Sequence, residues 1–189
     1  MSLRALSCML VAAITCACAR SSQPPALAAA AKSPVELYFP LVDGTIFTYQ
    51  GGAHDEMFMV RVKRTGPSTA QLITGDSVKM LSVSPTSVRR DSAGALLQSP
   101  LEIGASWQGD HGTVRIVDLH AQVQVPAGSF KHCLHTLEEV GGDVHGRIDT
   151  WFCPDVGIAK MIVEQWQAGQ AVSVTTELRA FGPSVDLRK

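Results

Sequence analysis

Short segments of alternating apolar and polar residues fill the chain from residue 44 onward, and this pattern limits the fold more than any other feature. The clearest is 171–181, where Val172, Val174, Leu178 and Ala180 share one face and polar residues take the other. Side chains of a strand point alternately to its two faces, so a period of two predicts a sheet with one solvated face. No stretch of about 12 residues in this region repeats at the helical period of 3.6 residues.

Turn-forming residues separate these segments, and most of the 16 Gly and 10 Pro lie between them. Such punctuation is typical of short strands joined by hairpins. We therefore expect a mainly β fold of about ten short antiparallel strands, arranged as a half-barrel, a barrel or a sandwich. The segments with strand character are 44–49, 57–63, 70–74, 78–83, 87–91, 95–98, 113–119, 121–125, 129–140, 145–153, 158–167 and 171–181.

The N-terminal segment has the features of a secretory signal peptide. Arg4 supplies one positive charge, and residues 5–17 are uncharged and mostly apolar. This run is shorter than the roughly 20 residues that a membrane-spanning helix needs. Small residues follow it, as they do at a signal-peptide cleavage site. We therefore expect the protein to be exported.

Two cleavage sites are compatible with this leader. The sequence Ile-Thr-Cys-Ala-Cys resembles a lipobox, which makes Cys18 the lipidated first residue of the mature protein. The sequence Ala-Cys-Ala that ends at Ala19 fits ordinary signal peptidase and a soluble secreted product. We favour a periplasmic or outer-membrane lipoprotein, held to the membrane by its N-terminal lipid. The expected organisation is a signal peptide over 1–17, a flexible tether over 18–33 and a single β domain over 34–189.

The charge of the chain argues against a nucleic-acid partner. The 16 Lys and Arg residues nearly balance the 17 Asp and Glu residues. Basic residues gather only at 61–64 and 89–90, and no stacking aromatic residues flank either group. Nucleic-acid-binding domains carry a basic patch or stripe, which is missing here. We interpret the group at 61–64 as the solvated face of a strand.

The only cysteines after the first twenty residues, Cys133 and Cys153, flank the Gly-Gly-Asp sequence that ends at Asp143. Such a cluster is a hairpin signal. If the turn centres on Asp143, the two cysteines lie opposite each other and close enough for a disulfide, which an exported protein favours. The same register pairs Leu134 with Phe152, His135 with Trp151, Thr136 with Thr150 and Glu139 with Arg147.

A metal site and free thiols are the alternatives to this disulfide. Candidate ligands cluster in the same stretch of sequence: His132, Cys133, His135, His145, Asp149 and Cys153. On a regular strand, however, residues three apart such as His132 and His135 point to opposite faces and do not converge on one ion. We therefore favour the disulfide and assign no metal ligand.

Catalytic motifs are missing from the sequence. It contains no G-x-S-x-G, no H-E-x-x-H, no Gly-rich phosphate loop and no C-x-x-C. We therefore assign no catalytic residue and no cofactor, and an enzyme is the less favoured interpretation. A hydrolase whose site is assembled from distant residues stays open.

Three segments resemble a group of uncharacterised bacterial envelope lipoproteins. The stretch 37–49 resembles their Y-F-P-L-x-x-G-x-x-W-x-Y opening, with Phe47 in place of the usual Trp. Residues 125–130 match V-P-A-G-x-F, and 151–157 match an aromatic pair followed by P-x-V-G. The resemblance implies a mostly-β domain similar to the half-barrels of periplasmic lipoprotein carriers. It implies no established activity and no catalytic residues.

These features favour an envelope lipoprotein whose β domain binds an apolar ligand or an envelope protein without catalysis. Tyr49, Phe130 and Trp151 are the candidate ligand-facing residues, although a purely architectural role suits them as well. One alternative is a structural or assembly module of the envelope with a filled core. The other is the hydrolase considered above.

Overall fold

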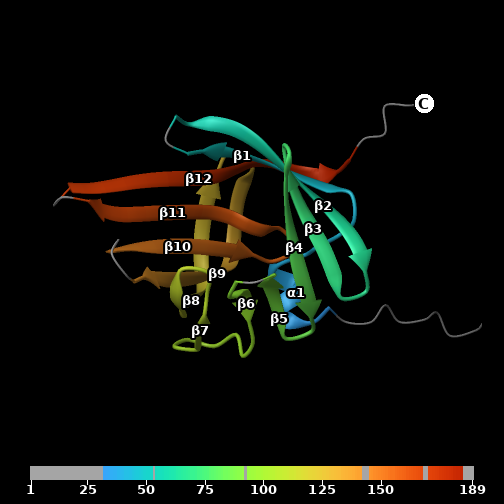
Figure 1. Ribbon diagram of the computed structural model, residues 1–189, viewed down its shortest axis with the longest axis horizontal. Helices are drawn as coiled ribbons and strands as arrows, with labels where there is room; N and C mark the ends of the chain where they lie inside the picture. Colours follow the sequence, from blue (N-terminus) through green and yellow to red (C-terminus); the bar gives the residue numbers. More distant parts are fainter. Residues whose placement is uncertain (1–31, 53, 92, 142–144, 168–169, 185–189) are drawn as a thin grey trace, which may run out of the picture. The chain divides into compact units, whose positions relative to one another are not determined.

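The computed structural model describes residues 32–52, 54–91, 93–141, 145–167 and 170–184, all within one compact unit that begins at Lys32. The predicted signal peptide, most of the predicted tether and Cys18 lie outside these residues. The described strands form one twelve-stranded sheet in the order β6-β5-β4-β3-β2-β1-β12-β11-β10-β9-β8-β7 (Figure 1). Their bounds are β1 (Thr45–Gly51), β2 (Glu56–Gly66), β3 (Thr69–Thr74), β4 (Ser77–Ser84), β5 (Ser87–Arg90), β6 (Ala95–Gln98), β7 (Ser106–Gln108), β8 (Gly112–Val125), β9 (Gly128–Val140), β10 (His145–Cys153), β11 (Gly157–Gln167) and β12 (Gln170–Pro183).

The expected all-antiparallel β fold is confirmed, with twelve strands instead of about ten. The predicted segments 113–119 and 121–125 belong to the single strand β8. The short strand β7 was not predicted, because three residues are too few to show a period of two.

The short helix α1 (Pro34–Tyr38) was not predicted either. It begins with a capping box, in which the Ser33 side chain accepts from the Glu36 amide and the Glu36 carboxylate accepts from the Ser33 amide. Pro34 suits the first helical turn, where its missing N–H leaves no hydrogen bond unmade. Among the described residues, no helix is long and apolar enough to cross a membrane.

The sheet curls until its two edge strands, β6 and β7, meet in a nearly closed barrel (Figure 1). The indole Nε1 of Trp107 donates across this seam to the Ala95 carbonyl at 2.9 Å. Next to it, Arg90 Nη1 pairs with Asp110 Oδ2 at 2.5 Å. A Cβ on Gly94 would overlap the Gly109 carbonyl, so the two backbones are in direct contact at this point. The described strands β6 and β7 are nevertheless not paired by a ladder of hydrogen bonds.

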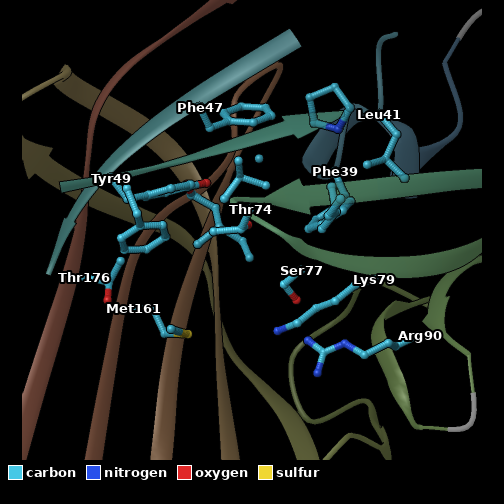
Figure 2. A pocket seen from close by; sticks show the side chains of 16 residues that line it. Phe39, Leu41, Phe47, Tyr49, Thr74, Ser77, Lys79, Arg90, Met161 and Thr176 are labelled. Carbon is cyan, nitrogen blue, oxygen red and sulfur yellow. The ribbon is translucent and has the colours of Figure 1, made fainter. Parts of the chain in front are cut away.

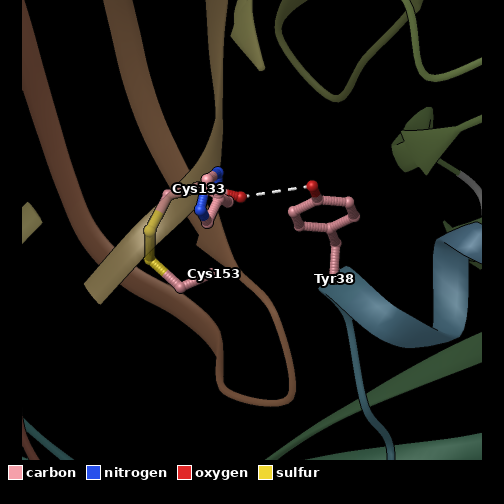
Figure 3. The surroundings of a disulfide bond; sticks show 4 residues. Tyr38, Cys133 and Cys153 are labelled. Atoms are coloured by element: carbon pink, nitrogen blue, oxygen red, sulfur yellow. Dashed lines mark hydrogen bonds between the residues drawn. A yellow bond between two sulfur atoms is a disulfide. The ribbon is translucent and has the colours of Figure 1, made fainter. Parts of the chain in front are cut away.

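The predicted register of the cysteine hairpin is confirmed. β9 and β10 pair Leu134 with Phe152, His135 with Trp151, Thr136 with Thr150 and Glu139 with Arg147. The structure contains the disulfide between Cys133 and Cys153 that this register predicts (Figure 3). Beside it, the Tyr38 hydroxyl donates to the His132 carbonyl at 3.2 Å, which ties the end of α1 to β9 (Figure 3).

The strict alternation predicted for the last strand is wrong at its C-terminal end. Arg179 has no pairing partner on β1, so it forms a bulge in β12. An extra residue reverses the side-chain alternation beyond it. Leu178, before the bulge, is fully buried as expected. Beyond the bulge Ala180 is exposed, and Phe181 stacks on Phe47 with 6.4 Å between ring centroids.

Two clusters of buried side chains fill much of the barrel interior. The first joins α1 to strands on both sides of the seam, and Phe39, just after α1, lies 5.9 Å from Phe152 between ring centroids. The second surrounds the disulfide and includes Phe47, Tyr49 and Leu178. Burying apolar side chains in this way contributes about 25 cal/mol per Å² and is the main stabilising term of such a fold.

Candidate binding cavity

An apolar cavity of about 370 Å³ lies between the inner faces of β1–β5 on one side and β11–β12 on the other (Figure 2). The segment 39–41 that follows α1 forms part of its wall. Ten of its sixteen lining residues are aromatic, aliphatic, Pro or Met: Phe39, Pro40, Leu41, Phe47, Tyr49, Phe58, Val60, Leu72, Ile158 and Met161. The remaining ones are Thr74, Ser77, Lys79, Arg90, Gly157 and Thr176.

Strand alternation explains why this wall is apolar. Phe47 and Tyr49 are two residues apart on β1, and their pairing partners Val60 and Phe58 on β2 point to the same inner face. The Tyr49 ring stacks with Phe58 at 5.6 Å and with Phe47 at 6.3 Å between centroids. The aromatic pair in the 37–49 motif therefore builds one side of the cavity.

The Tyr49 hydroxyl reaches across the barrel interior to β11, where it donates to the Ile158 carbonyl at 3.0 Å. Burial raises the pKa of the Tyr49 phenol far above its usual value, so the group stays protonated and able to donate. With its polar atom occupied, the ring offers only carbon surface to the cavity.

The two charged lining residues and Ser77 lie at the β4–β5 side of the cavity. Lys79 and Ser77 are exposed, whereas Arg90 is half-buried and its guanidinium is paired with the nearly buried carboxylate of Asp110. Arg90 Nε and Asp110 Oδ1 are buried and find no hydrogen-bond partner among the described residues. The cavity thus has an aromatic and aliphatic part and a cationic part.

Of the three aromatic residues predicted to face a ligand, Tyr49 lines the cavity and the other two do not. Phe130 packs against Phe181, with 6.3 Å between ring centroids. Trp151 stacks on His135 at 4.2 Å and an interplanar angle of 10°. The structure therefore separates the three side chains that the sequence analysis had grouped.

The sequence analysis missed the two cationic lining residues, although a signal was present. Lys79 shares the inner strand face with Leu81, which is fully buried, because the two are two residues apart on β4. Arg90 likewise shares the inner face of β5 with the buried Val88. A cation on the apolar face of a strand is unusual and could have marked both positions.

A network of charged side chains lies near Trp151 but lines no part of the cavity. Asp149 Oδ1 lies 2.7 Å from His135 Nε2, and Asp149 Oδ2 lies 3.2 Å from Arg147 Nε. Arg147 Nε is also 3.1 Å from Glu164 Oε2. Since this His–Asp pair lines no part of the cavity, it does not support the hydrolase alternative. The described residues contain no group of three or more His, Cys, Asp or Glu side chains that could hold a metal ion.

Comparisons with known proteins support the fold alone. Neither a scan against protein-family models nor a search of curated proteins finds a match. A solved structure from Bacteroides fragilis, provisionally described as an exported protein with a YmcC-like fold, aligns with a TM-score of 0.51 and 14% identity over 77% of this chain and 99% of its own. A second, from Parabacteroides distasonis and provisionally described as a lipoprotein, has a TM-score of 0.47 and 14% identity over 77% of this chain and 98% of its own.

Proposed function

We propose that this protein is an envelope lipoprotein whose barrel holds an apolar chain in the cavity between β1–β5 and β11–β12. The observation that carries the proposal is the cavity of about 370 Å³, lined mainly by aromatic and aliphatic side chains. Ligand pockets commonly have volumes of about 300–1,000 Å³ and an apolar lining with a few polar groups. No catalytic group is needed for such a role.

The volume indicates the size of the ligand. An engineered cavity of about 150 Å³ accepts one benzene ring, which has six carbons. By proportion, a cavity of about 370 Å³ has room for about 15 carbons. One alkyl chain of about this length therefore fills the cavity. Each methylene group that enters contributes about 0.8 kcal/mol to binding.

The envelope location is suggested by the leader and is compatible with the oxidised Cys133–Cys153 pair and with the description of the Bacteroides fragilis structure as an exported protein. Lipidation at Cys18 would hold the barrel at a membrane face through the tether. Replacing Cys18 with Ala should abolish acylation and release the protein from the membrane fraction. Unchanged membrane retention of Cys18→Ala would contradict the lipid anchor without affecting the cavity proposal.

Binding in the cavity is tested by filling it. Met161 lines the cavity from β11, and its cross-strand partners Thr150 and Thr176 are buried, so a Trp at this position projects into the same space. Ile162 is next in sequence and faces the opposite side of the sheet, so Ile162→Trp is the matched control. The probe is the uncharged fluorophore N-phenylnaphthylamine, added to delipidated protein, together with native mass spectrometry of protein purified from membranes.

We expect the wild type and Ile162→Trp to bind the fluorophore and to carry a chain in native mass spectra. Met161→Trp should bind at least tenfold more weakly, because its indole occupies the space of several methylene groups. If wild-type protein carries no chain and binds no fluorophore, the proposal is wrong and the structural module becomes the better interpretation.

A further inference from the structure

The charge of the cavity has one sign. Among the described residues, the charged side chains that line it are Lys79 and Arg90, and no carboxylate lines it. Figure 2 shows the ends of both side chains on the same side of the cavity, close to Ser77. An apolar chain alone gives no reason for two cations at this position.

The sheet holds the two cations near each other. Arg90 on β5 pairs with Leu81 on β4, and Lys79 is two residues from Leu81 on the same face. Lys79 and Arg90 are therefore diagonal neighbours, a relationship that places residues about 7–8 Å apart. One small headgroup can contact both side chains at this spacing.

The positive charges are only partly balanced. Asp110 compensates Arg90 across the seam, at 2.5 Å from Nη1. The Lys79 ammonium forms no ion pair within the described part of the chain. One excess positive charge therefore borders the apolar space and attracts an anion, and water around the exposed Lys79 screens part of that attraction.

A lysine at the surface is usually no more than a solvated charge, and Lys63 on β2 is an example. Lys63 is exposed and alternates with the fully buried Val62, so it points away from the barrel interior. Lys79 differs because it shares the inner face with Leu81 and lines the cavity. Its position at the border of the apolar lining is the geometry expected for holding the polar end of a ligand.

From this arrangement we propose that the occupant is a single-chain amphiphile with an anionic headgroup, a carboxylate or a phosphate, bound by Lys79 and Arg90. The alkyl chain lies against Phe47, Tyr49 and Met161. Ser77 supplies a hydroxyl donor beside the cations. This inference rests on the proposed function and adds to it the chemical class of the ligand.

The test compares probes that share one chain and differ in the headgroup: dodecanoate, dodecyl phosphate and uncharged dodecanol. Each displaces N-phenylnaphthylamine from delipidated wild-type protein in competition titrations. Both anions should bind about tenfold more tightly than dodecanol. A tenfold difference corresponds to the lower end of what a hydrogen bond to a charged group contributes, and we expect the lower end because Lys79 is exposed to water. A preference for only one anion identifies which headgroup the site recognises.

Two variants test whether Lys79 causes the preference for anionic probes over dodecanol. Lys79→Gln should bind dodecanol as the wild type does but lose most of the tenfold preference for the anions. Lys63→Gln makes the same change of net charge away from the cavity and should keep the preference. Lys79 has no ion pair with another described residue, so its replacement should leave the thermal unfolding midpoint close to that of Lys63→Gln.

The possible failures are distinct. If the fluorophore binds but dodecanol competes as well as the anions, or if Lys79→Gln keeps the full preference, the headgroup inference is overturned and the apolar cavity stands. If neither the fluorophore nor any of the three probes binds, the proposed function falls and the headgroup inference falls with it.

Discussion

Loss of the Cys133–Cys153 disulfide should destabilise the barrel by an amount that the structure allows us to work out. The bond closes a loop of 20 residues. The chain-entropy relation for a loop of this length gives about 3 kcal/mol at 25 °C, because the cross-link restricts the unfolded chain. Reduction of the wild type removes this contribution while leaving both sulfur atoms in place.

The Cys133→Ala/Cys153→Ala variant should lose more than the reduced protein does. Both cysteines are fully buried in the cluster that contains Val123 and Leu178, so truncation also leaves unfilled space. For a domain of this size, 3 kcal/mol corresponds to a fall in melting temperature of roughly 6–12 °C.

Guanidinium titrations followed by far-ultraviolet circular dichroism, with and without reductant, measure these losses. The denaturant dependence should steepen on reduction, because the unfolded chain becomes more expanded. A change below about 1 kcal/mol on reduction, with an unaltered slope, would refute the reasoning, because the bond would then constrain nothing in the unfolded state.

Two further substitutions test the seam and the cavity wall. Gly94→Ala places a methyl group against backbone at the β6–β7 seam and should lower the free energy of unfolding by about 1–3 kcal/mol, measured by thermal unfolding. The control Gly141→Ala, where a methyl group meets open space, should lower it little. Equal effects of the two variants would show that the strands at the seam can move apart without loss of stability. Tyr49→Phe leaves the half-buried Ile158 carbonyl without its donor and should cost about 1 kcal/mol. Tyr38→Phe should cost less, because it frees the carbonyl of His132, an exposed residue whose carbonyl water can reach. If Tyr38→Phe cost more than Tyr49→Phe, the assigned contacts would be contradicted.

The parts of the fold that could be predicted from sequence are local ones. The register of β9 with β10 was predicted from the turn residues around Asp143 and the pattern of the two flanking segments, so Cys133 could be placed opposite Cys153 without knowledge of the rest of the chain. The alternation in β12 holds to Leu178 and then fails, because a bulge at Arg179 changes the face of every residue beyond it. Nothing in the local pattern of 171–181 marks that insertion.

The binding cavity shows the same limit. The aromatic pair at Phe47 and Tyr49 was visible in a motif, and Tyr49 does line the cavity. Phe130 and Trp151 were equally plausible from sequence, but their neighbours are Phe181 and His135. Which aromatic side chains converge depends on how far the sheet curls, and that is a property of all twelve strands together.

The sequence by itself therefore determined the class of fold, the boundaries of most strands and the cysteine pairing, because a period of two and a turn signal act over neighbouring residues. Only the tertiary structure decided that β6 meets β7, that an apolar space stays open in the interior and that Lys79 and Arg90 border it. The physical reason is the closure of the sheet. It brings Asp110 to Arg90 and encloses the apolar space that Lys79 and Arg90 border. The residues that meet in this way share no local pattern in the chain.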